Sequence, residues 1–151
     1  MAAKVAENFL HTRMRAASDS RRMDIVGRYG VTDSRLVTAL TIMESHIEHL
    51  LSLEAIAIRA GLSPRQLERL FRAAFKTTPV RFYLELRLKQ AQSLVQDTNA
   101  SLSEIALRCG FTSSSHLGQS YRQKFGATPG TARKSKADAA AQESRILMSK
   151  S

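Results

Sequence analysis

The sequence has a single cysteine and lacks any long run of apolar residues. Cys109 is the only cysteine, so it cannot close a disulfide within the chain. It lies in an apolar helical pattern that needs a small residue, which predicts a thiol packed in the core. No stretch reaches the roughly eighteen apolar residues of a transmembrane helix, and the segment MAAKVAENFLHTRMR lacks an apolar run with a cleavage site. We therefore expect a cytoplasmic protein that does not bind membranes.

Acidic residues are scarce relative to basic ones. Lysine and arginine number 23 against 13 aspartate and glutamate residues, which gives a formal net charge of +10 at pH 7. This excess favours a polyanionic partner, and nucleic acid is the first candidate. A basic membrane-surface helix would place its charges beside one broad apolar face, whereas here they are spread over several short amphipathic segments. At 151 residues the chain accommodates one domain with tails.

The chain contains an internal repeat. The first copy, LEAIAIRAGLSPRQLERLFRAAFKTTP, occupies residues 53–79, and the second, LSEIALRCGFTSSSHLGQSYRQKFGATP, occupies residues 102–129. One residue is inserted in the second copy, so the offset between equivalent positions changes from 49 to 50 along the repeat. Equivalent pairs include Leu53 and Leu102, Gly61 and Gly110, Phe71 and Tyr121, and Pro79 and Pro129.

Each copy predicts a helix, a tight turn and a second helix. Gly61 and Gly110 end the first helix, because glycine readily takes the positive φ of a helix C-terminus. A hydroxyl residue two positions later, Ser63 or Thr112, caps the second helix. We therefore expect two helix-turn-helix units, at about residues 53–75 and 102–125.

Capping and packing residues support these units. Two capping boxes are expected, Ser63 with Gln66 and Ser101 with Glu104. Ala57 and Ala106 are small enough to let the second helix of each unit cross the first closely. The second helix of the first unit has an apolar stripe with the spacing of a buried face, formed by Leu67, Leu70, Phe71, Ala74 and Phe75.

Three further helices are expected outside the repeat. A helix at about residues 79–96 joins the units through an apolar face of Val80, Tyr83, Leu84, Leu88, Ala91 and Val95. Upstream, Asp33 or Ser34 caps a helix that covers the first unit with Leu36, Leu40, Met43, Ile47 and Leu50. Downstream, a short helix opens at Thr128 and Pro129 and ends near Lys134. The pattern thus predicts an all-α domain at residues 33–134.

The two ends of the chain are expected to lie outside this domain. Residues 1–32 form an N-terminal arm whose last part, residues 18–32, mixes charges with Gly27 and Gly30 and is interpreted as a linker. The tail at residues 135–151 has few large apolar residues and is expected to be disordered.

The exposed side chains of the first unit indicate its partner. The second helix of a helix-turn-helix lies in the DNA major groove, with its first turn at the base edges. Here Arg65, Arg69, Arg72 and Lys76 form a cationic stripe opposite the apolar one. Because the planar guanidinium matches guanine O6 and N7, we expect Arg65 and Arg69 to read bases. Gln66 is expected to assist them, and Arg72 to contact phosphate.

The second unit presents shorter polar side chains to DNA. The expected contacts are Ser114, Ser115, His116, Gln119 and Arg122, which give a less distinctive readout than arginine. Two alternatives stay open: the serines at 113–115 serve capping alone, and His116 is a solvated ring. A linking helix of about 17 residues is roughly 26 Å long, and with about 10 Å of packed helix it approaches the 34 Å repeat of B-DNA. One chain is thus expected to enter two successive major grooves.

Residues 35–134 resemble the DNA-binding domain of the AraC/XylS family of bacterial transcription regulators. The most specific stretch is IALRCGFTSSSHLGQSYRQKFGATP. The resemblance implies a seven-helix domain that binds promoter DNA, usually as an activator that contacts RNA polymerase. The sequence departs from many members at Arg65, where others have a large aromatic or another polar residue, and at Gln119, where arginine is common.

The segment AENFLHTRMR resembles the junction in members with an amidotransferase-like (DJ-1/PfpI-type) sensing domain. Such members include regulators of amine and amino-acid catabolism. The resemblance implies that a small-molecule effector binds a domain absent from this chain, on which Val5, Phe9, Leu10 and Met14 would pack. The alternative is a free amphipathic arm of a short protein.

Two other functions compete with DNA binding. His46 and His49, with Glu44 and Glu48, have the spacing of a metal pair, but no third ligand elsewhere completes a zinc site. We therefore expect no enzyme, no cofactor and no bound metal. A protein-interaction adaptor on the same scaffold is the second alternative, and it has no need of the arginine stripe.

Overall fold

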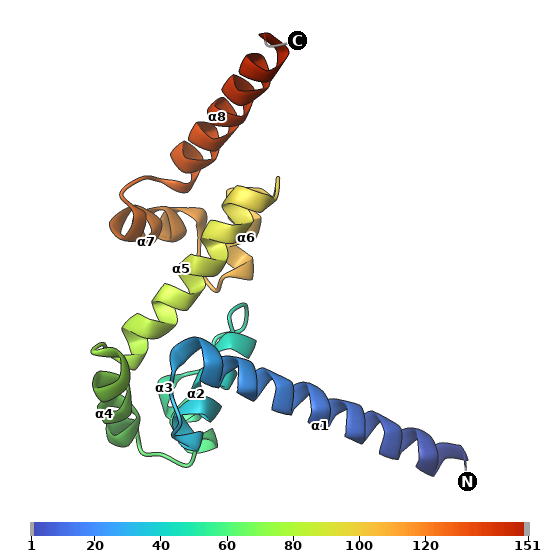
Figure 1. Cartoon of the computed structure of the whole chain (residues 1–151). Helices are drawn as coiled ribbons and strands as arrows, with labels where there is room; N and C mark the ends of the chain where they lie inside the picture. Colours follow the sequence, from blue (N-terminus) through green and yellow to red (C-terminus); the bar gives the residue numbers. More distant parts are fainter. Residues whose placement is uncertain (1, 150–151) are drawn as a thin grey trace. The chain divides into compact units, whose positions relative to one another are not determined.

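The computed structural model describes residues 2–149, and side chains from residue 10 to residue 149. This part of the chain contains eight helices and no strand (Figure 1), so the expected all-α class is correct. The expected seven helices omit the first of the eight. The helices are α1 (Ala2–Tyr29), α2 (Ser34–Ser45), α3 (Leu53–Arg59), α4 (Pro64–Phe75), α5 (Pro79–Asp97), α6 (Leu102–Arg108), α7 (Ser114–Phe125) and α8 (Pro129–Ser149).

The predicted linker at residues 18–32 is wrong, because α1 continues through it to Tyr29. Arg22 donates to Thr38 Oγ1 of α2 at 2.9 Å, and Ile25, one turn further along the same face, is fully buried. These residues face α2 at helical spacing, so tertiary packing stabilises a helix that composition alone does not favour. Gly30, with φ +65°, ends the helix as its N–H donates to the Val26 carbonyl.

The predicted disordered tail also differs, because α8 runs from Pro129 to Ser149. Its first turns are anchored to the C-terminal end of α5. The Arg133 guanidinium donates to the Ala100 carbonyl at 2.7 Å and to the Val95 carbonyl at 3.2 Å. Lys136 Nζ donates to the Gln96 carbonyl at 2.7 Å. Beyond Lys136 every side chain through Ser149 is exposed, and the alanine-rich sequence itself favours helix.

The chain divides into two compact units. The first comprises Met1–His46 and Leu51–Arg81, and the second comprises Ile47–Leu50 and Phe82–Ser151. The chain therefore leaves the first unit after His46, contributes Ile47–Leu50 to the second unit, and re-enters the first unit at Leu51. Ile47 packs against the core of the second unit, which corrects the expectation that Ile47 and Leu50 continue the apolar face of α2. That helix ends at Ser45.

Both predicted helix-turn-helix units are present. Gly61 has φ +73° and Gly110 has φ +76°. In each turn the following residue donates its N–H back to an alanine carbonyl at 2.8 Å, from Leu62 to Ala57 and from Phe111 to Ala106. In each unit this hydrogen bond spans the left-handed glycine and gives a partner to a carbonyl in the last turn of the first helix. Both alanines are buried, as the crossing of the two helices requires.

The helix caps agree with expectation in part. Asp33 caps α2, and Ser63 with Gln66 forms a complete capping box on α4. Ser101 caps α6, but the Glu104 carboxylate accepts from Arg108 instead of closing a second box. Ser113 caps α7 in place of the expected Thr112, because the residue inserted in the second copy moves the cap one position along.

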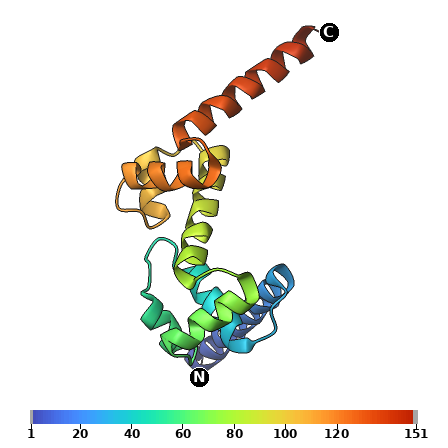
Figure 2. The same cartoon turned by 90° about the vertical axis from the view of Figure 1, so that its left-hand side faces the viewer.

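The second unit has a core formed where α6 and α7 pack beside α5 (Figure 2). Cys109 is fully buried in it, as predicted, and burial raises the pKa of its thiol to about 11. Three residues that were expected on buried faces are exposed instead: Val80, at 62%, Leu50, at 42%, and Ala74. Val80 lies in the first turn of α5, and Ala74 in the last turn of α4.

Candidate nucleic-acid interface

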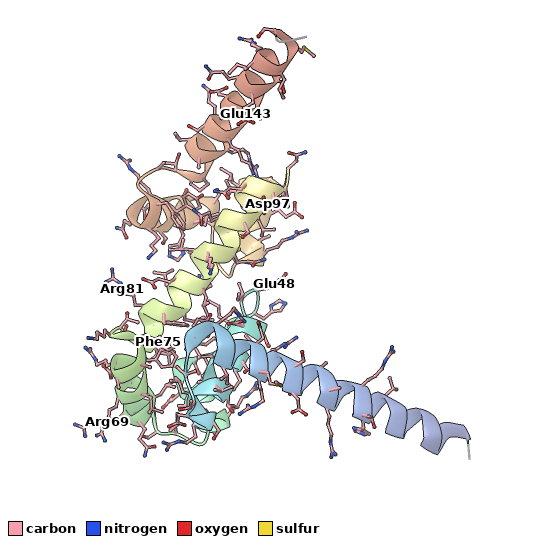
Figure 3. The ribbon with its side chains drawn as sticks, viewed as in Figure 1. Glu48, Arg69, Phe75, Arg81, Asp97 and Glu143 are labelled. Atoms are coloured by element: carbon pink, nitrogen blue, oxygen red, sulfur yellow. The ribbon has the colours of Figure 1, made fainter. Side chains whose placement is uncertain are left out.

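The first unit holds α4 with one face buried and the opposite face exposed. Leu67 and Phe71 are buried, while Arg65, Arg69 and Arg72 are exposed. Arg69 points away from the body of the unit (Figure 3). The predicted base readers Arg65 and Arg69 therefore lie on the solvent-exposed face of α4, with the charge and reach that DNA recognition requires.

The cationic stripe on α4 includes one acidic residue. Glu68 accepts from Arg72 Nε and Nη2, each at 3.3 Å, and both side chains are exposed. Together with Arg65 and Arg69 this pair surrounds a shallow hollow. Because an exposed ion pair contributes little free energy, a phosphate competes readily with Glu68 for Arg72. The predicted phosphate contact thus requires Arg72 to exchange the Glu68 carboxylate for a phosphate oxygen.

Gln66 and Lys76 are partly committed to the ends of α4. Gln66 Oε1 accepts from the Ser63 backbone N–H at 2.9 Å, which leaves its amide nitrogen as the group that could donate to a base. Lys76 adopts left-handed backbone angles and ends the helix, with its N–H donated to the Arg72 carbonyl. Lys76 thus lies beyond the end of α4, and the cationic residues of the stripe within the helix are Arg65, Arg69 and Arg72.

Arg35 is a residue of this surface that the sequence reasoning missed. A second small hollow is lined by Arg35 together with Leu62, Gln66, Arg69 and Leu70. The Arg35 guanidinium is held by Asp33, with Nη2 and Oδ2 3.0 Å apart. The hydrogen bonds that Arg35 donates lower the pKa of the Asp33 carboxyl. The sequence gives no signal for this placement, because Arg35 lies outside the repeat and reaches α4 only through the packing of α2.

The second unit presents its predicted residues along α7. Ser114, Ser115, His116, Gln119 and Arg122 are all exposed, while Leu117 and Tyr121 on the opposite face are buried. Ser113 Oγ accepts from the His116 N–H at 3.1 Å, so capping falls to Ser113. The hydroxyl groups of Ser114 and Ser115 are not the cap and lie on the exposed first turn.

The His116 ring is packed as well as solvated. Its centroid lies 5.2 Å from that of Phe111 in an edge-to-face arrangement, and Nδ1 lies 3.4 Å from Thr112 Oγ1. Phe111 is buried. The aromatic contact and the hydroxyl restrict the imidazole, so His116 presents its other ring nitrogen from a defined position.

Two of the four residues considered for metal binding, Glu44 and His46, have other partners. Glu44 accepts from Arg28 at 2.8 Å and from the Tyr29 hydroxyl at 2.9 Å. A ring nitrogen of His46 lies 2.9 Å from the Ile42 carbonyl. Among the described side chains, residues 10–149, no group of three or more His, Cys, Asp or Glu is arranged to hold a metal ion. Across the same residues, no helix is both long and apolar enough to cross a membrane.

Comparison with known protein families and curated proteins gives consistent matches. A helix-turn-helix domain family matches residues 56–135. The HTH-type transcriptional regulator CdhR of Pseudomonas aeruginosa is 41% identical over 129 residues, which are 85% of this chain and 38% of that protein. The regulator ArgR of the same organism is 36% identical over 129 residues. The chain thus spans about two fifths of the length of these relatives.

Two solved structures are similar over most of the chain. An AraC-type transcriptional regulator from Chromobacterium violaceum is 45% identical, with a TM-score of 0.65, and the match covers 68% of this chain and 92% of that one. The DNA-binding domain of the global transcriptional factor AdpA, solved with a target DNA, is 28% identical, with a TM-score of 0.68. That match covers 73% of this chain and 99% of the AdpA domain.

Proposed function

Because this chain belongs to the AraC family of helix-turn-helix transcription regulators, we propose that it binds specific sites in double-stranded DNA through α4 and α7. The observation that carries the proposal is the exposure of Arg65 and Arg69 on a helix whose other face is buried. The related AdpA domain was solved on a target DNA, which supports the same partner here. The family is one of transcription regulators and not of enzymes.

The two recognition helices are proposed to use different chemistry. On α4, Arg65 and Arg69 donate to guanine edges, Gln66 assists, and Arg72 exchanges Glu68 for phosphate. On α7, Ser114, Ser115, His116 and Gln119 contact bases, and Arg122 contacts phosphate. We expect the α4 half of the site to contribute most of the discrimination, because each bidentate arginine–guanine pair contributes about 1–3 kcal/mol.

We further propose that α4 and α7 enter successive major grooves. The helix that joins the two helix-turn-helix units, α5, contains 19 residues. This length is close to the roughly 17 residues expected from the sequence for a helix that spans one duplex turn together with the packed helices. The prediction is two protected regions one duplex turn apart on one face of the DNA. Hydroxyl-radical footprinting of the unmodified chain tests this directly, and protection confined to one groove would contradict it.

The wider role follows the family resemblance. We propose promoter sites as targets, activation through contact with RNA polymerase, and a small-molecule effector that binds a part of the protein outside this chain. Regulation of amine or amino-acid catabolism is the corresponding physiological prediction. Leu10 and Met14, both exposed on α1, are the described residues on which such a further domain would pack.

Selection of bound duplexes from a random pool tests the central proposal. A specific binder enriches one sequence, and its affinity for that duplex falls by orders of magnitude between about 50 and 200 mM salt. A protein-interaction adaptor would enrich no sequence and show no such salt dependence. That second outcome would replace DNA binding with the adaptor function.

A further inference from the structure

The turns of the two helix-turn-helix units have the same backbone but different surroundings. Gly61 and Gly110 both take a left-handed conformation, at φ +73° and +76°. A Cβ atom placed on Gly61 would meet nothing within 4 Å. A Cβ on Gly110 would lie 2.6 Å from the Ile47 carbonyl oxygen and 3.0 Å from the Leu50 side chain. The turn of the second unit is therefore enclosed by the Ile47 carbonyl and the Leu50 side chain, whereas that of the first is open.

Arg87 holds the same turn from α5. Its Nε donates to the Cys109 carbonyl at 2.9 Å, and its Nη2 donates to the Gly110 carbonyl at 2.7 Å. These carbonyls lie at the end of α6, where helix geometry leaves acceptors without partners in the helix. Burial lowers the pKa of Arg87, so the guanidinium is kept in place against a desolvation cost. A charged donor is thus committed to fixing this turn.

The same arginine is linked to a candidate base-contacting residue. The Arg87 Cζ atom lies 4.3 Å from the centre of the Phe111 ring, in a cation–π arrangement. Phe111 in turn contacts the His116 ring edge to face, with centroids 5.2 Å apart. Two contacts therefore lead from Arg87 to the first turn of α7.

We propose that Arg87 and the segment Ile47–Leu50 form a clamp on the α6–α7 turn that sets the angle at which α7 meets DNA. Arg87 is a positioning residue: it acts on the α7 half of the site through Phe111 and His116 and touches no base itself. The inference rests on the proposed function, because it concerns how one of the two recognition helices is held. It adds that the two units differ in rigidity, with the α7 turn fixed and the α4 turn open.

The glycine pair provides a matched test. Gly110→Ala and Gly61→Ala impose the same left-handed strain on alanine, but only Gly110→Ala also drives a methyl group into the Ile47 carbonyl. Arg87→Met removes both donors at similar length, and Arg87→Lys restores a single donor. Each variant is made in the full chain, and its thermal unfolding is measured first. If Arg87→Met fails to fold, Gly110→Ala and Arg87→Lys carry the test.

Binding is measured on three duplexes: the sequence selected by the unmodified chain, and two derivatives with one half scrambled. The α7 half is the one whose protection is lost in a His116→Ala, Gln119→Ala double variant. On the intact duplex we expect Arg87→Met and Gly110→Ala to bind about tenfold more weakly, and Arg87→Lys to lie between Arg87→Met and the unmodified chain. On the duplex with the α7 half scrambled, all of them should equal the unmodified chain.

Several results would overturn the clamp. One is an equal loss from Arg87→Met on both halves, and another is unchanged binding despite a lowered melting temperature. A third is the same response of the α7 half to Gly61→Ala as to Gly110→Ala. In each case the unmodified chain still selects a sequence, so the proposed function stands. Failure of the unmodified chain to select any sequence would overturn both proposals.

Discussion

Arg28 and Glu44 form an ion pair of 2.8 Å that joins the end of α1 to α2. The Tyr29 hydroxyl donates to the other carboxylate oxygen of Glu44 at 2.9 Å, and the Tyr29 ring lies edge to face with Phe75 of α4. Phe75 is half-buried at the end of α4, beside the last turn of α1 (Figure 3). The carboxylate of Glu44, only 20% exposed, therefore accepts from two consecutive residues of α1. The end of α1 is thus part of the folded unit that carries α4.

Removal of the Glu44 carboxylate should loosen α1. We expect Glu44→Ala to lower the free energy of unfolding by about 1 kcal/mol, since it removes two hydrogen bonds but Arg28 is largely solvated. Amide hydrogen exchange should show reduced protection at residues 21–29. Asp24→Ala is the control, because it removes only the exposed second partner of Arg28 and should leave most of the protection at residues 21–29 in place. Equal effects of the two substitutions would mean that Glu44 does not hold α1.

Stability should depend on the ionisation of Tyr29 at alkaline pH. Burial, with help from Glu44, raises the pKa of Tyr29 from 10.0 to about 12. The folded state therefore binds this proton more tightly than the unfolded state, so the contribution is complete below about pH 10 and is lost as the pH rises towards 12. Urea unfolding at pH 9 and at pH 11 measures the loss. It should be smaller in Tyr29→Phe, and identical losses would exclude Tyr29 as the source.

Arg69 should contribute sequence discrimination and little general affinity. We expect Arg69→Ala to weaken binding to the selected duplex by about 1–3 kcal/mol while barely changing binding to random DNA. Arg72→Ala is the matched comparison on the same helix, and it should weaken both duplexes alike and reduce the salt dependence. Fluorescence anisotropy on the two duplexes measures these changes. Equal losses for Arg69→Ala on both would assign Arg69 to phosphate.

The residues on α7 should affect one end of the site alone. Joint substitution of His116 and Gln119 by alanine is expected to change base preference in one half of the selected sequence, because both lie on a single helix. A second selection from the random pool with this variant shows which positions lose their preference. Altered preference in both halves would contradict separate readout by α4 and α7.

Local sequence signals predicted the repeat accurately. Glycine at 61 and 110, a serine cap before α4 and apolar spacing along both copies are short-range determinants, and the helices appear where these signals place them. The exposure of Arg65, Arg69, Gln119 and Arg122 follows from the same periodicity, since the buried faces leave only one side for them. Their roles at DNA stay predictions.

Misleading local signals account for the errors. Two glycines within residues 18–32 favoured a linker, yet Gly27 lies within α1 and Gly30 caps its end. Ile47 and Leu50 fit the apolar spacing of α2, but the helix ends at Ser45 and both residues belong to the second unit. In both cases contacts with residues distant in the chain outweigh a weak local preference.

The sequence by itself determined the helix-turn-helix repeat, the excess of basic charge and the faces of α4 and α7, because these depend on periods and caps within a few residues. Only the tertiary structure decided that α1 packs on α2, that Arg35 borders α4, and that Arg87 with Ile47–Leu50 encloses one turn and not the other. The physical reason is that a guanidinium or a carbonyl has many possible partners. Which one it meets depends on how helices far apart in the sequence pack together.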